Sequence, residues 1–386
     1  VPQPLLPAPK PILSVLQSLC SSSSWPRTGS PRGRHSSPDV PPWPVRSRDS
    51  RGCKCCSTRP GRQLGASTGR GDTGGTGGKE RGEKGSRGGK SMSRSPPALW
   101  SPAPAPHRLR SLARSWPDGD APWPDPALVA AGDTATRAEL LSKSGAGVPG
   151  GVLEGSPLAE AVFGVSGCSV SRRIPEGSPL PPGRAVVAEV EGPAVGVLGG
   201  RVALNILGRC SGVASMAARA VGVARARGWA GVVAGTRKTT PGFRLAEKYA
   251  LGVGGTDPHR AGLGGLLLLK DNHRALAAAA GGLRQMIVGV HRAGGFTRKL
   301  EGECSSAEAA LEAAGAGADI VLLDNLAPHE LHAAAARVKA LHPGVMVEAS
   351  GGIVLETLPH FLGPHTDVMS MGCLTHGAPA LDFTLK

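Results

Sequence analysis

The sequence has no long uninterrupted apolar segment. Its apolar runs, such as residues 266–269 among glycines, are far shorter than the ~20 residues that a membrane-spanning helix needs. The segment LLPAPKPILSVLQSLC near the start is interrupted by prolines and lacks the pattern of a signal peptide. We therefore expect no membrane segment and no targeting segment, and we expect the cytoplasm as the location.

Two partial motifs lack the residues that would complete them. Cys53, Cys55 and Cys56 lie close together, but no second pair of Cys or His follows at the spacing of a zinc site. The segment GGKS (88–91) ends like a phosphate-binding loop, but Lys84 occupies the required earlier glycine position. No apolar strand precedes this segment either. We expect the cysteines to be free thiols in a reducing compartment.

Acidic residues are scarce at the start of the chain. Up to Trp100 there are 17 Lys and Arg against 5 Asp and Glu, so this quarter carries most of the formal net charge of +15. Residues 1–97 are also rich in Gly, Ser and Pro without apolar periodicity, which predicts a disordered basic extension. A tail that binds nucleic acid or membranes is the alternative. The rest of the chain is nearly balanced, which argues against nucleic acid as a partner of the folded part.

A long helix is predicted in the middle of the chain. Residues 201–228 are Ala-rich, with apolar residues at helical spacing and few strand-forming residues. Gly208 and Gly212 are the points where this helix could break. Before it, residues 185–197 alternate and are rich in valine, which predicts strands.

Six short apolar runs follow this helix, and each ends in polar or glycine residues. Ala-rich amphipathic segments separate them, and the repeat of about 20–35 residues is that of a β/α unit. In a β/α barrel the carboxyl ends of the strands converge on the face that holds the active site. We therefore expect the polar ends to meet. The runs are 231–240, 265–273, 296–305, 318–325, 345–352 and 367–372.

The residues at these ends carry charges of both signs. Arg237, Lys238 and Lys270 suit a polyanionic substrate, while carboxylates suit a divalent metal or a developing positive charge. Small residues let backbone N–H groups approach a phosphate. Together these groups suit displacement of pyrophosphate from a sugar, because the leaving group is anionic and the sugar carbon becomes cation-like. The carboxylates are Glu301, Glu303, Asp324 and Glu348, and the small residues are Ser350, Gly351, Gly352 and Gly372.

These motifs resemble those of the quinolinate phosphoribosyltransferases. GTRKTTPGFR (235–244), KDNH (270–273), ECSS (303–306), LLDN (322–325) and VEASGGI (347–353) occur in the order and approximate spacing of that family. The first motif is highly specific, whereas SGG or SMG alone would be weak. The resemblance is strong from residue 201 onward, weaker over 107–200 and absent before. It implies an α/β fold, with an N-terminal α/β sandwich-like domain (98–211) and an incomplete β/α barrel of about seven strands (212–386).

The resemblance also implies a reaction. Quinolinate and phosphoribosyl pyrophosphate would give nicotinate mononucleotide, pyrophosphate and CO2, with Mg²⁺ as the cofactor. The quinolinate carboxylates and the phosphates would be bound by Arg237, Lys238, His259, Arg260 and Lys270. Arg201 would join them from the partner subunit of a homodimer or higher oligomer with shared active sites.

The same resemblance assigns the remaining residues. Glu303 and Asp324 would face the ribose and the metal-bound pyrophosphate, so any contact with the metal would be indirect or through pyrophosphate. Ser350, Gly351, Gly352 and Gly372 would hold the ribose 5-phosphate. The catalytic candidates are Lys238, Lys270, Glu303 and Asp324.

Some residues admit a second interpretation. Lys270 could form a Schiff base as in aldolase barrels, His259 could be an ordinary loop histidine, and Glu301 could only balance charge. For the whole chain, the alternatives are another phosphosugar-binding barrel enzyme, or an inactive relative with a nucleic-acid-binding tail. The sequence also departs from the family pattern at Gly200, Ala261 and Gly302, and a glycine inside a strand weakens it by ~1 kcal/mol.

Overall fold

The computed structural model describes residues 104–120, 125–143, 151–276 and 281–386. All of them belong to one compact unit, which runs from Gly88 to Lys386. The extension predicted for residues 1–97, with its partial motifs, lies outside the described residues. None of the helices in the described ranges combines the length and the apolar character of a membrane span.

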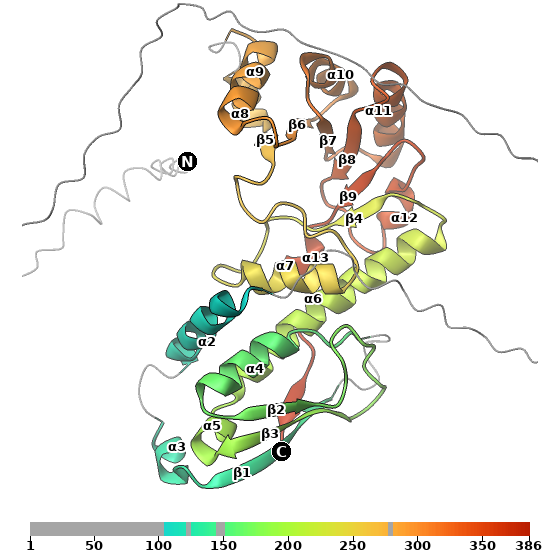
Figure 1. Ribbon diagram of the computed structural model, residues 1–386. Coiled ribbons are helices and arrows are strands. Elements are labelled where there is room, and N and C mark those ends of the chain that lie inside the picture. The colour runs from blue at the N-terminus through green and yellow to red at the C-terminus, as the bar shows by residue number, and fades with distance from the viewer. Residues whose placement is uncertain (1–103, 121–124, 144–150, 277–280) are drawn as a thin grey trace, which may run out of the picture. The chain divides into compact units, whose positions relative to one another are not determined.

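The N-terminal part is built on a four-stranded antiparallel sheet with the strand order β10-β1-β3-β2 (Figure 1). Its edge strand β10 comes from the end of the chain, where Leu385 pairs with Leu140. Helix α4 packs against both α2 and α6. The strands are β1 (Ala135–Ser142), β2 (Ser169–Arg172), β3 (Ala185–Pro193) and β10 (Phe383–Leu385), and the helices are α2 (Pro106–Asp120), α3 (Pro126–Ala131), α4 (Ser156–Val165) and α5 (Ala194–Leu198).

The long helix α6 (Arg201–Ala226) confirms the prediction for residues 201–228, but it does not break at its glycines. A Cβ at Gly208 would lie 2.6 Å from the carbonyl oxygen of Leu381, and one at Gly212 would lie 2.0 Å from that of Pro379. Both glycines therefore let the C-terminal segment cross the helix at close range. The N–H of Leu381 in turn donates to the carbonyl of Gly208 at 2.9 Å.

The C-terminal part contains a parallel sheet with the strand order β4-β9-β8-β7-β6-β5. All six predicted apolar runs are strands of this sheet, so the α/β class with a parallel sheet is confirmed. Within the described residues the sheet is open between β4 and β5, and it has six strands rather than about seven. An isolated parallel bridge between Ala234 and Asp257 adds to the β4 edge. The strands are β4 (Val232–Ala234), β5 (Leu267–Leu269), β6 (Leu300–Cys304), β7 (Ile320–Asp324), β8 (Met346–Ser350) and β9 (Val368–Ser370).

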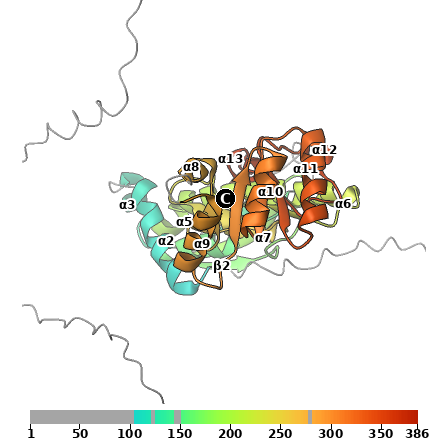
Figure 2. The ribbon, with the colours of Figure 1, turned by 90° about the horizontal axis from the view of Figure 1, so that it is seen from above.

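Helices follow the strands of this sheet. Helix α10 packs against β6 and β7, with α11 beside it (Figures 1 and 2). The glycine in β6 serves this packing, because a Cβ at Gly302 would lie 3.3 Å from the Cβ of Ala313 in α10. The helices are α7 (Arg244–Val253), α8 (Asp271–Ala275), α9 (Leu283–Gly294), α10 (Ala307–Ala316), α11 (Pro328–Leu341), α12 (Leu358–Phe361) and α13 (Cys373–His376).

Another departure from the family pattern has a packing reason. A Cβ at Gly200 would lie 2.8 Å from the ring of Phe163, which is fully buried. Any residue with a Cβ at position 200 would therefore force Phe163 to move. Ala261 is exposed, and nothing in the structure explains that departure.

Candidate active site

Polar side chains of the parallel sheet gather at the carboxyl ends of its strands. Arg237 and Lys238 follow β4, Lys270 follows β5, and Glu303 lies near the end of β6. Asp324 ends β7 and is paired in register with Ser350, which ends β8. Because parallel strands place equivalent ends at one edge, residues far apart in sequence line a single face.

The positively charged side of this face centres on Arg237. Its Nε is buried and has no hydrogen-bond partner among the described residues. Burial and the charge of Arg237 lower the pKa of Arg260, so the two guanidinium groups are close enough to repel each other. Burial also lowers the pKa of Lys248 to about 8, with Arg244 adding to the effect. Closely spaced cations with an unpartnered donor suit a polyanionic ligand.

A buried carboxylate holds the loop that carries these cations. Glu247 accepts hydrogen bonds from the N–H of Thr240 at 2.9 Å and from its hydroxyl at 2.8 Å. The guanidinium of Arg209, on α6, donates to the same carboxylate at 2.9 Å. Thr375 of α13 donates its hydroxyl proton to the carbonyl of Lys238 at 2.7 Å. The loop is therefore fixed to α7 and α13, and through Glu247 to α6.

The negatively charged side consists of Glu303 and Asp324. Glu303 forms an ion pair with Lys270, and it is 12% exposed. Burial and the charge of Glu303 raise the pKa of Asp324. The amide of Asn325 donates to Asp324 at 2.7 Å. Two adjacent carboxylates suit a divalent cation such as Mg²⁺, since oxygen is its preferred ligand.

Two glycine turns border this face. Gly351 has φ 101°, and a Cβ there would lie 2.3 Å from Oδ1 of Asn325, so only glycine fits. Gly352 also has a left-handed backbone, with φ 60°. A Cβ at Gly372 would approach the side chain of Lys238 within 3.1 Å. These turns expose backbone where a phosphate group can approach.

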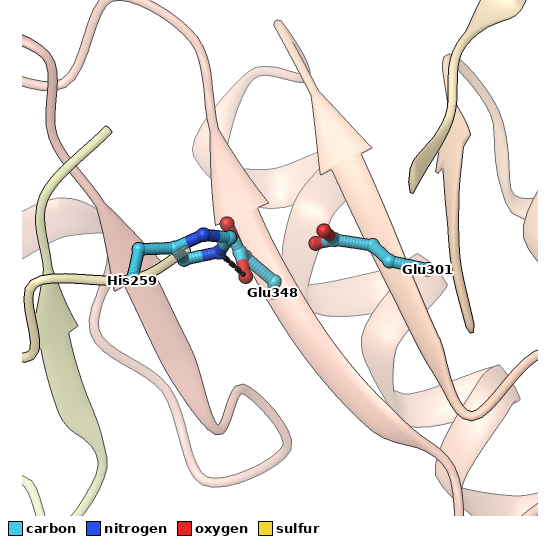
Figure 3. A group of neighbouring side chains, drawn as sticks. All are labelled: His259, Glu301 and Glu348. Atoms are coloured by element: carbon cyan, nitrogen blue, oxygen red, sulfur yellow. Dashed lines mark hydrogen bonds and ion pairs between the residues drawn. The ribbon is translucent and has the colours of Figure 1, made fainter. Parts of the chain in front are cut away.

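One layer below lies a buried cluster of His259, Glu301 and Glu348 (Figure 3). Nε2 of His259 lies 3.1 Å from Oε2 of Glu348, which is almost fully buried. Burial and the charge of Glu348 raise the pKa of Glu301 to about 9, and neither of its carboxyl oxygens has a hydrogen-bond partner in the described structure. Burial alone would also raise the pKa of Glu348, but His259 holds it below its ordinary value.

The structure thus brings together most of the residues predicted for the site, with one exception. Arg201 begins α6, is exposed, and lines a hollow with Thr136 and Lys386 beside the N-terminal sheet. Within one chain it does not lie with the Arg237 cluster.

Sequence reasoning placed Glu348 among the carboxylates at the strand ends but gave it no individual role, and it did not single out Glu247 or Lys248. A carboxylate in the middle of the apolar run VMVEAS was a usable signal for Glu348, because buried carboxylates need a partner. Glu247 and Lys248 lie in helix α7, where charged residues ordinarily face solvent, so no comparable signal marks them in the sequence.

Together, the fold and these residues define an α/β enzyme that binds polyanionic substrates at one end of a parallel sheet. The chain belongs to the quinolinate phosphoribosyltransferase family. Residues 127–211 match the family's N-terminal domain and residues 213–386 match its C-terminal domain.

Individual relatives agree with this assignment. The human carboxylating nicotinate-nucleotide pyrophosphorylase is 54% identical over 282 residues, which cover 73% of this chain and 92% of the relative. The Dictyostelium discoideum protein of the same name is 36% identical, covering 72% of this chain and 95% of the relative. The crystal structure of NadC from Streptococcus pyogenes is 33% identical with a TM-score of 0.65, covering 74% of this chain and 98% of that one.

Proposed function

We propose that this chain transfers the phosphoribosyl group of phosphoribosyl pyrophosphate to quinolinate, giving nicotinate mononucleotide, pyrophosphate and CO2 in de novo NAD synthesis. The observation that carries the proposal is the pairing, at one sheet edge, of a cation cluster with an unpartnered arginine donor and a facing pair of carboxylates. The family membership of the chain supplies the identity of the substrates.

In this reaction the bond between the ribose C1 and pyrophosphate breaks, and the quinolinate ring nitrogen bonds to C1. The carboxylate next to that nitrogen leaves as CO2, and a proton takes its place on the ring. We assign the quinolinate carboxylates to Arg237, His259 and Arg260, since an arginine fork matches a carboxylate. We place Lys238 and Lys270 between the two substrates, where their point charges attract the phosphates of one and the carboxylates of the other.

The carboxylates act on the ribose. Glu303 and Asp324 face the position where C1 becomes cation-like, and a negative charge there stabilises the transition state more than the ground state. Mg²⁺ fits this carboxylate pair, directly or through pyrophosphate, and when bound it would neutralise charge on the leaving group. Ser350, Gly351, Gly352 and Gly372 are the proposed contacts for the ribose 5-phosphate.

We further propose a homodimer, or a higher oligomer, in which Arg201 of one subunit completes the site of another. The position of Arg201 in a hollow lined by residues of the N-terminal sheet, and not by Arg237, supports this arrangement. A cytoplasmic location is also proposed. The support is that the four cysteines in the described part, Cys168, Cys210, Cys304 and Cys373, are all free.

The direct test is product formation. Purified full-length chain is incubated with quinolinate, phosphoribosyl pyrophosphate and Mg²⁺, and nicotinate mononucleotide is followed by chromatography. Reactions without each component, and with EDTA, are the controls. Absence of product under conditions in which the human relative turns over would refute the proposal.

A further inference from the structure

The floor of the proposed site contains two carboxyl groups that the reaction described above does not use. Glu301 lies two residues before Glu303 on β6, and Glu348 lies two residues before Ser350 on β8. Side chains two apart on a strand share a face, and one step of two residues is ~6.6 Å. Glu301 and Glu348 therefore point to the same side as the site residues, one layer deeper.

His259 connects this floor to the substrate. Its Nε2 lies 3.1 Å from Oε2 of Glu348, and its side chain is 15% exposed against 3% for that of Glu348. The neighbouring residue Arg260 and the loop around it lie on the cation side of the site. With Nε2 bound below, Nδ1 is the ring atom left for a substrate carboxylate (Figure 3).

The backbone of His259 is held in an unfavourable conformation. Its φ is 58°, in the left-handed region that residues with a Cβ avoid. Its N–H donates to Oδ1 of Asp257 at 2.6 Å, and Asp257 is itself bridged to β4. The residue is therefore fixed at two points, its backbone by Asp257 and its ring by Glu348. Strain of this kind persists where the surroundings enforce a particular side-chain position.

We propose that Glu348 is a positioning residue for quinolinate binding, which accepts the Nε2–H of His259 and so aims the imidazole at a substrate carboxylate. This inference rests on the proposed function, and it gives the deeper carboxylate a role through His259 rather than through contact with substrate. Glu301 lies within 4.8 Å of this pair, but neither of its carboxyl oxygens has a hydrogen-bond partner among the described residues.

Charge alone predicts the opposite effect, which makes the inference testable. Removing a negative charge beneath a dicarboxylate pocket should strengthen the binding of quinolinate if only electrostatics operate. If Glu348 acts by positioning, Glu348→Gln should raise the KM for quinolinate ~5-fold or more, because a charged acceptor is replaced by a weaker neutral one. The KM for phosphoribosyl pyrophosphate should change less than about twofold.

Three further variants complete the test. Glu348→Asp keeps the charge but shortens its reach, and should also raise the quinolinate KM. Glu301→Gln changes the neighbouring carboxyl group but keeps the Glu348 acceptor of His259, and should raise the quinolinate KM less than Glu348→Gln does. In a double-mutant cycle, Glu348→Gln should add little to His259→Asn, since both remove the same interaction. Melting temperatures show which variants are folded.

Several results would overturn the inference. One is a quinolinate KM that falls or stays constant in Glu348→Gln. Another is a Glu348→Asp variant with the KM of wild type. A third is a double mutant in which the effects of Glu348→Gln and His259→Asn simply add. A stoichiometric transition metal in the purified protein, lost in both Glu301→Gln and Glu348→Gln, would instead make the cluster a metal site. If the wild-type chain forms no nicotinate mononucleotide, the proposed function fails rather than this assignment.

Discussion

Arg237 offers the sharpest test of where the two substrates bind. Its Nε is buried without a hydrogen-bond partner in the described structure, so an anionic substrate that accepts from this donor would offset its desolvation. Arg237→Lys keeps the positive charge but loses the planar fork. One charged hydrogen bond contributes about 1.5–3 kcal/mol. Losing one of the two hydrogen bonds that the fork makes to a carboxylate should therefore raise the KM for quinolinate ~10-fold, which corresponds to roughly 1.4 kcal/mol.

The assay varies each substrate while the other is saturating. The KM for phosphoribosyl pyrophosphate should change much less than that for quinolinate. Arg173→Lys is the matched control, because Arg173 is an exposed arginine paired with Glu189 in the N-terminal sheet, and both constants should stay within about twofold. If Arg237→Lys weakens phosphoribosyl pyrophosphate and spares quinolinate, the substrate placement is inverted. The dicarboxylate pocket would then lie around His259, Arg260 and Lys270.

Four other predictions follow from the same structure. Glu303→Gln should lower kcat at least ~10-fold while the KM for quinolinate is largely kept, because its charge matters most when the ribose becomes cationic; an unchanged kcat would remove it from catalysis. Arg201→Ala and Lys238→Ala should each be inactive alone and recover partial activity when mixed, whereas no recovery after subunit exchange would mean that Arg201 acts within its own chain or only structurally. A carboxyl group whose pKa is raised in the folded protein stabilises the fold below its unfolded pKa. That contribution is lost as the pH rises through the folded pKa. Since the pKa of Glu301 is raised to about 9, Glu301→Gln should gain stability over wild type between about pH 5 and pH 9, by ~1 kcal/mol or more in urea denaturation at the upper end. Deleting residues 1–97 should leave kcat and the melting temperature nearly unchanged, and a large loss in either would show that this segment contributes to the fold.

The parallel sheet was predictable because its signal is local. Strands buried on both faces appear in the sequence as short apolar runs, and all six runs became strands. The charged residues at their ends were predictable for the same reason, since a parallel sheet brings equivalent ends together.

What the sequence did not reveal depends on contacts between distant residues. A break in α6 at Gly208 or Gly212 was a reasonable local expectation, but these glycines fit carbonyl groups of residues 379 and 381. The bond between His259 and Glu348 joins positions 89 residues apart. The three-residue strand β10 carries no pattern of its own, and only its pairing with β1 defines it.

That last strand affects the order in which the protein can form. Its pairing with β1 ends at the C-terminal residue, where the N–H of Lys386 donates to the carbonyl of Glu139 at 2.9 Å. During synthesis, β1 leaves the ribosome more than two hundred residues before β10. At a synthesis rate of ~5–20 residues per second, β10 is made roughly ten seconds or more after β1. Until then, the edge of β1 that pairs with β10 has no partner strand from its own chain. The sheet whose first strand is synthesised earliest is therefore among the last to be completed.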